Sequence, residues 1–150
     1  IKHDILHASV LFGGIGDHIS DSDFLQVGQF ESGTEELNKW LTGLYLEGNG
    51  GGQSKESYLL AYLFAGRHTS IDCFEKRQQR GFLFSIGDEG TWEDVDADTL
   101  KNLMGYKESE GITVDQVLAE AQRLGLRECG YLPNGRAEEA CAVVLEQYDP

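Results

Sequence analysis

The chain has 150 residues, of which 40% are hydrophobic and 25% charged, so it can bury a core as one domain without cross-links. Its 26 acidic and 12 basic residues give a formal net charge of -14, which argues against nucleic acid and anionic membrane surfaces as partners. No stretch of about 18 apolar residues occurs that would suggest a membrane-spanning helix. Cys73, Cys129 and Cys141 lack metal-site spacing and are typical of a reduced chain, so we expect a cytoplasmic protein.

The first half of the sequence alternates between strand and helix patterns. Residues 8–15 form an almost continuous apolar run, which predicts a strand buried on both faces. Residues 25–30 alternate as in a short strand, and 31–34 precede a helix predicted over 35–45. A glycine-rich loop then leads into a second predicted helix over 58–68.

The second half continues the alternation. Residues 82–86 have the length and flanks of a central strand, after a charged lead-in over 75–80. The remaining predicted elements are helices over 98–104 and 113–124, a short strand over 129–132 and a final helix over 137–148.

This order predicts an α/β fold. Strands that alternate with helices favour a doubly wound, mostly parallel sheet with helices on both faces, as in Rossmann-like proteins. No linker or internal repeat interrupts the chain, so we expect a single domain over residues 1–150. In such a sheet, ligands bind at the carboxyl ends of the strands.

Two aspartates follow predicted strands at that edge. Asp17 and Asp88 each come after a glycine, in Ile-Gly-Asp-His and Ile-Gly-Asp-Glu. Carboxylates at one edge of a sheet suit a hard divalent cation, which prefers oxygen ligands. The alternative is that each aspartate caps the turn or helix that follows it.

The glycine-rich loop over residues 48–56 supplies a third candidate. Its glycines allow close backbone approach to a ligand, and Ser54 lies where we expect the next helix to begin. The Ser54 hydroxyl is therefore a candidate ligand for a metal or a phosphate, or simply a helix N-cap. The loop is not a Walker A motif, and residues 13–16 lack the dinucleotide-binding spacing.

Other chemistry-bearing residues have weaker patterns. His18 adjoins Asp17 and is the histidine nearest the predicted site, whereas a Cys73–His68 nucleophilic pair has little support in sequence. The acidic run over residues 93–98 lacks the ligand spacing of a calcium-binding EF-hand, which favours a solvated acidic face.

Taken in order, these motifs resemble the von Willebrand factor A-like (VWA) domains, and most closely the intracellular microbial and phage type. The resemblance covers residues 8–132 and is carried by Gly-Asp-His at 16–18, Gln-Phe-Glu at 29–31, Gly-Gly-Gly-Gln-Ser-Lys-Glu-Ser-Tyr at 50–58 and Ile-Gly-Asp-Glu at 86–89. It implies a metal-ion-dependent adhesion site (MIDAS) that holds Mg2+ or another divalent cation, with Ser54 in the place of a threonine ligand and Asp88 in the place of the last aspartate.

The family's first motif, Asp-x-Ser-x-Ser, is absent from this sequence. The chain is therefore expected to begin after the family's first strand and helix, which would leave the sheet without its central strand. Another polypeptide or segment would then supply that strand, or the sheet would be rearranged.

The resemblance implies a non-enzymatic protein-interaction module that uses a metal at Ser54 and Asp88, and the strand-end position of Asp17 adds it as a third candidate ligand. Its expected partner is a MoxR-type AAA+ ATPase or another complex subunit. One alternative is a metal-free structural or assembly protein. Another is a metal-dependent hydrolase or phosphotransferase, with Asp17 and Asp88 as ligands and His18 as base, although the sequence offers no convincing nucleophile.

Overall fold

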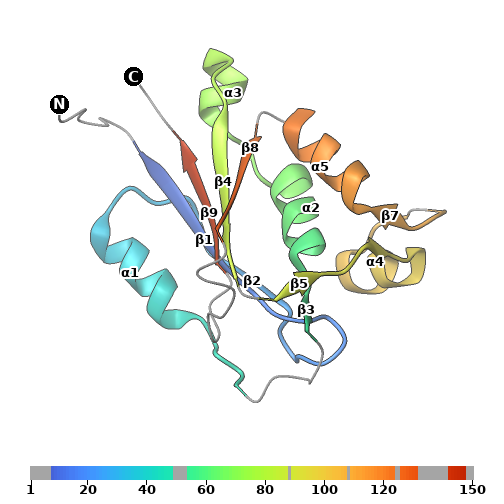
Figure 1. Cartoon of the computed structure of the whole chain (residues 1–150). Coiled ribbons are helices and arrows are strands. Elements are labelled where there is room, and N and C mark those ends of the chain that lie inside the picture. Colours follow the sequence, from blue (N-terminus) through green and yellow to red (C-terminus); the bar gives the residue numbers. More distant parts are fainter. Residues whose placement is uncertain are drawn as a thin grey trace.

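A mixed five-stranded sheet lies at the centre of the protein (Figure 1). The computed structural model describes residues 8–48, 54–87, 89–107, 109–123, 126–131 and 142–147. Across the sheet the strand order is β2 (Leu25–Val27), β1 (Ser9–Ile15), β9 (Ala142–Gln147), β4 (Gly81–Ile86) and β8 (Leu126–Tyr131).

Strand direction decides where the loops lie. Strands β1 and β4 both run antiparallel to β9, so they point the same way, and β8 is parallel to β4. The carboxyl ends of β1, β4 and β8 therefore share one edge of the sheet. The α/β class is confirmed, but the expected mostly parallel sheet is not. Only the β4–β8 pairing in this sheet is parallel, whereas β2 and β9 pair antiparallel with their neighbours.

Residues 142–147 of the helix predicted over 137–148 form strand β9, and the rest of that prediction lies outside the described residues. Ala142–Gln147 pairs with β1 on one side and β4 on the other, and Val144 lies opposite both Phe12 and Phe84. Residues 142–145 are Ala-Val-Val-Leu, and the two β-branched valines favour a strand over a helix. The helical prediction was wrong because it used local periodicity, whereas the open position between β1 and β4 requires a strand.

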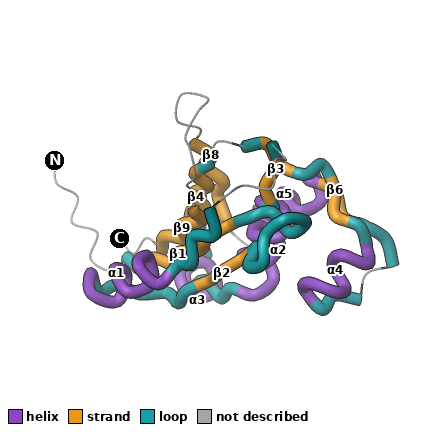
Figure 2. The backbone as a smooth tube through the Cα atoms, turned by 90° about the horizontal axis from the view of Figure 1, so that it is seen from below, coloured by secondary structure: helices purple, strands orange, loops and turns teal. Residues whose placement is uncertain are grey.

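Helices lie on both faces of the sheet (Figures 1 and 2). Helix α1 (Thr34–Gly43) lies on one side, and α2 (Tyr58–His68) and α5 (Val114–Arg123) lie on the other. The predicted helices over 35–45, 58–68 and 113–124 are confirmed with small shifts at their ends. Two shorter helices, α3 (Asp72–Arg77) and α4 (Ala97–Met104), complete the helices in the described residues.

The core forms between α2 and the sheet. Nearly the whole circumference of α2 is buried, because this helix packs between the sheet and α5. Leu60, Leu63, Leu83, Leu100 and Val117 are each no more than 2% exposed. Within the described part of the chain, no helix is long and apolar enough to cross a bilayer.

Two short strand pairs lie outside the main sheet. The pair β3 (Lys55–Glu56) and β5 (Gly90–Thr91) is parallel, and the pair β6 (Asp94–Val95) and β7 (Ile112–Thr113) is antiparallel. The first pair joins the end of the glycine-rich loop to the segment that follows β4. It therefore fixes two of the candidate loops relative to each other.

Candidate functional site

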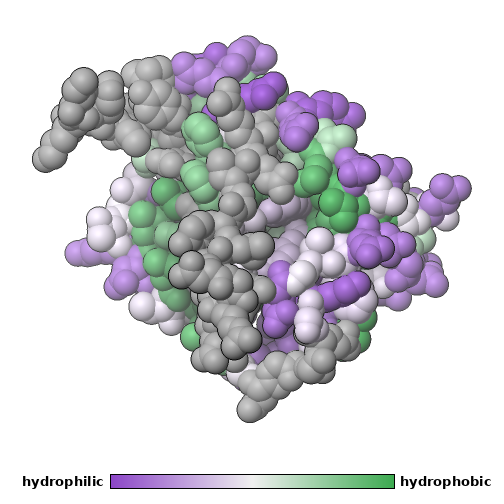
Figure 3. All heavy atoms as spheres, in the orientation of Figure 1, coloured by the Kyte–Doolittle hydropathy of each residue, from purple (hydrophilic) through white to green (hydrophobic). Residues whose placement is uncertain are grey.

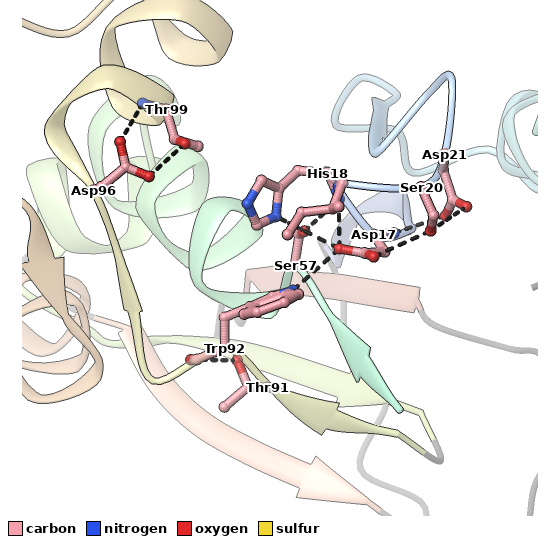
Figure 4. Close-up of polar contacts among 10 residues, drawn as sticks. Asp17, His18, Ser20, Asp21, Ser57, Thr91, Trp92, Asp96 and Thr99 are labelled. Atoms are coloured by element: carbon pink, nitrogen blue, oxygen red, sulfur yellow. Dashed lines mark hydrogen bonds and ion pairs between the residues drawn. The ribbon is translucent and has the colours of Figure 1, made fainter. Parts of the chain in front are cut away.

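Three loops meet at the edge where β1 and β4 end. The backbone N–H of Ser57 donates to the carbonyl of Gly16 at 3.1 Å, which joins the start of α2 to the end of β1. The N–H of Gly90 donates to the carbonyl of Ser54 at 3.2 Å, next to the β3–β5 pair. Segments that lie far apart in the sequence thus form one polar edge (Figure 4).

Asp17 is the buried carboxylate of this edge. The residue is 3% exposed. Its Oδ1 accepts hydrogen bonds from Trp92 Nε1 at 3.1 Å and from the Ile19 backbone at 3.2 Å. Its Oδ2 accepts one from the Ser20 hydroxyl at 3.1 Å. Both oxygens are therefore engaged by the protein, and the Ile19 bond is the local turn-capping contact expected of an aspartate after a strand.

Ser57 contributes the hydroxyl at this site. It is the N-cap residue of α2 and only 2% exposed. Its Oγ accepts the backbone N–H of His18 at 2.8 Å and lies 2.7 Å from His18 Nδ1. His18 Nδ1 is also 3.7 Å from Asp17 Oδ1. Because Ser57 is buried and bonded, it holds His18 in place and is not accessible as a nucleophile.

Ser54, in contrast, is exposed and precedes β3. We expected the next helix to begin at Ser54, but α2 begins at Tyr58 and its N-cap is Ser57. The two-residue strand β3 intervenes because residues 55–56 pair with β5. Asp88, the other predicted ligand, lies outside the described residues.

An indole side chain and a lysine complete the edge. Trp92 donates its Nε1 proton to Asp17, and its ring meets the His18 ring edge-on with centroids 5.6 Å apart. Lys55 Nζ lies 5.0 Å from the Trp92 centroid, in cation–π contact. Ile19, whose backbone N–H donates to Asp17, is 56% exposed. The rim of the edge is thus a mixture of apolar, aromatic and cationic groups over a buried carboxylate.

Sequence reasoning missed Ser57 and Trp92. Ser57 directly precedes the apolar stripe of α2, and the preference of serine for N-cap positions is the signal that identifies it. Trp92 carries no comparable signal, because nothing local indicates that it will reach Asp17 across 75 residues of chain.

The remaining candidates serve as parts of the fold. Cys73 is completely buried. The His68 ring stacks between Phe64 and Tyr106, with centroid distances of 5.2 and 5.5 Å. In the acidic run, Asp96 is the N-cap of α4 and accepts from the Thr99 backbone at 2.9 Å. Among the described residues, no three His, Cys, Asp or Glu side chains form a group that could hold a metal ion.

Comparisons with protein-family models, with curated proteins and with solved structures gave no match to this chain.

Proposed function

We propose that this protein is a cytoplasmic, non-enzymatic protein-interaction module, a VWA-like variant of the doubly wound α/β fold, whose partner docks on the edge formed by the three loops. The observation that carries the proposal is the buried Asp17 carboxylate, which joins its own loop to Trp92 on the segment after β4, while Ser57 ties the start of α2 to the same loop. A fixed surface of this kind suits binding, because its side chains are ordered before the partner arrives.

The bonding of Asp17 favours a form of this module that needs no metal. Both Asp17 oxygens already accept hydrogen bonds, and a cation would have to displace donors such as Trp92 Nε1. Hydrogen bonds thus satisfy a buried charge that a metal would otherwise neutralise.

A divalent-metal site at Asp17, Ser54 and Asp88 is the second candidate. The hydrogen bond from Gly90 to the Ser54 carbonyl supports it, because this bond brings the segment after β4 beside the glycine-rich loop. In that case Mg2+ or a similar ion would leave a coordination position for a carboxylate of the partner.

Thermal unfolding in EDTA, compared with millimolar Mg2+ or Mn2+, separates the two forms. A metal that binds only the folded chain raises the melting temperature by mass action. We expect no shift for the wild-type protein. A shift that is lost in Asp88→Ala and kept in Asp98→Ala would instead establish the metal site.

Docking on the edge is tested with two exposed apolar residues. Ile19 lies on the edge, whereas Leu103, 40% exposed, lies on α4. The candidate partner is a MoxR-type AAA+ ATPase from the same source, purified and titrated by calorimetry. We expect Ile19→Asp to abolish binding and Leu103→Asp to retain it. Equal binding by the two variants would rule out this edge as the docking surface.

A further inference from the structure

A separate groove lies between α1 and β2, on the other side of the sheet from α2. It encloses about 510 Å3. Its lining comes from β2 and the residues after it and from one face of α1, namely Gln26, Val27, Gly28, Glu31, Glu36, Lys39, Trp40, Gly43 and Leu44. None of these residues belongs to the Asp17 edge, so the groove is a second candidate binding surface.

Helix α1 leaves its apolar side chains uncovered. It contains no buried residue, whereas eight residues of α2 are buried. Trp40, Leu41, Tyr45 and Leu46 are between 37% and 85% exposed. In Figure 3, hydrophobic residues gather at the left of the view, where α1 lies in Figure 1, and hydrophilic residues border them. Of these four residues Trp40 lines the groove, and the other three add exposed apolar surface in and just after α1. Exposed apolar residues beside a groove indicate a binding surface.

Specific contacts fix the walls of the groove. The side-chain amide of Gln26 donates to the Tyr45 carbonyl at 2.9 Å and accepts the Tyr45 N–H at 2.8 Å, which ties the chain after α1 to β2. The Trp40 ring lies against the Gly28 backbone, so close that a Cβ at Gly28 would be 2.9 Å from the ring. Trp40 Nε1 is 3.5 Å from Glu31 Oε1. The indole is therefore placed before any ligand binds.

The charged side chains that line the groove favour a cation. Glu31 and Glu36 supply two carboxylates against the single ammonium of Lys39. Within the described part of the chain, no ion pair engages any of these three side chains. The net charge of -14 adds a long-range attraction for basic partners and opposes pairing with a second copy of the same chain.

We propose that the α1–β2 groove binds an arginine side chain, presented next to an apolar residue by a basic segment of a partner protein. A guanidinium stacks on an indole and pairs with carboxylates through a planar set of donors, which an ammonium does not match. Val27 and Leu44 supply the apolar wall for the neighbouring residue. The site is independent of the Asp17 edge and of any metal bound there.

The test uses a short acetylated peptide of alternating arginine and leucine, titrated into the full chain by calorimetry. The control peptide carries citrulline, which keeps the shape of arginine but not its charge. We expect the arginine peptide to bind roughly tenfold more tightly than the citrulline peptide, since charge and stacking both contribute. Equal binding of the two peptides would overturn the proposal.

Matched variants locate the binding. Glu36 lines the groove and Glu35 does not, although both are exposed residues in the first turn of α1. We expect Glu36→Gln to weaken binding about fivefold, within the range of a solvent-accessible ion pair, and Glu35→Gln to change it less than twofold. Equal losses would indicate diffuse charge attraction and overturn the assignment.

A second variant tests the contribution of the Trp40 ring to arginine binding. Trp40→Leu keeps an apolar side chain but removes the ring, and we expect roughly tenfold weaker binding.

A second copy of the same chain is the other occupant that the groove could hold, and sedimentation of the free protein tests for it. A dimer that disappears in Trp40→Leu would assign the groove to a second copy. Ile19→Asp should leave peptide affinity unchanged, whereas lost affinity would move the peptide to the Asp17 edge. These experiments therefore test peptide binding in the α1–β2 groove separately from partner docking on the Asp17 edge.

Discussion

Asp17 combines nearly complete burial with hydrogen bonds to both of its oxygens. A carboxylate in that position is stable only while its donors remain, because an unpaired buried charge is costly. The residue thus links the conformation of its own loop to the position of Trp92, which lies on the segment after β4.

Replacing Asp17 with asparagine should destabilise the protein. An amide can accept on one side only, so a donor such as Trp92 Nε1 loses its acceptor, at a cost of about 1–3 kcal/mol. Asp23→Asn is the matched control, since Asp23 is exposed in the same loop and its loss should cost less than about 0.5 kcal/mol. Urea unfolding measures both. Similar stability of the two variants would contradict this role for Asp17.

At the scale of elements, polar side chains cap the starts of α4 and α5, whereas α1, α2 and α3 begin without a side-chain cap bond. Thr113 and Gln116 form reciprocal bonds at the start of α5: Gln116 Oε1 accepts the Thr113 N–H at 2.8 Å, and Thr113 Oγ1 accepts the Gln116 N–H at 3.4 Å. Helix α4 ends at Met104, and its C-cap is Gly105, whose φ of +71° is a conformation that suits glycine. The Arg67–Glu120 pair, at 2.8 Å, then joins α2 to α5, and the Arg67 hydrogen bond lowers the pKa of Glu120.

The cap of α4 makes its stability depend on pH. The Thr99 hydroxyl and then the Thr99 backbone N–H, both bonded to the Asp96 carboxylate, lower the pKa of Asp96 in the folded state. A lowered folded pKa means that the stabilisation is complete above the unfolded value of about 4 and is lost as pH falls through the folded value.

We therefore expect Asp96→Ala to lower the melting temperature at neutral pH and to matter progressively less as the solution is acidified below about pH 4. Scanning calorimetry of both proteins across this range provides the measurement. Asp98→Ala serves as the control, because Asp98 is an exposed residue of the same turn and is not the N-cap. A melting difference for Asp96→Ala that stays constant with pH would refute the linkage.

At the scale of the whole molecule, β9 joins the two halves of the sheet. It is the neighbour of both β1 and β4, and these two strands have no direct pairing in the described sheet. Every backbone N–H of such a central strand faces one partner or the other.

Proline at Val144 should therefore be more disruptive than alanine. Val144→Pro removes a ladder donor from the middle of β9, whereas Val144→Ala keeps it. We expect loss of cooperative thermal unfolding in the proline variant and a folded, two-state alanine variant. Circular dichroism follows both transitions. A cooperative transition in the proline variant would exclude β9 from the sheet centre.

The elements that the sequence predicted well are those whose signals are local. The apolar run of β1, the strand β4 and the amphipathic helix α5 were placed within a few residues, because apolar periodicity and helix caps depend on side chains that are close in sequence. Helix α3 was missed, since residues 72–77 are short and charged. The interpretation of Ser54 as the start of a helix differed from the structure because β3 forms only when β5 is present.

By itself, the sequence determined the α/β class, the acidic character of the protein and the presence of polar loops after β1 and before α2. These properties depend on composition and on patterns within single elements. Only the tertiary structure decided that the 142–147 segment is a strand, that Ser57 and Trp92 meet the Asp17 loop, and that α1 leaves a groove beside Trp40. Each of these outcomes depends on contacts between residues far apart in the chain. Packing and hydrogen bonds with the distant segment stabilise one local conformation over the others that the local sequence allows.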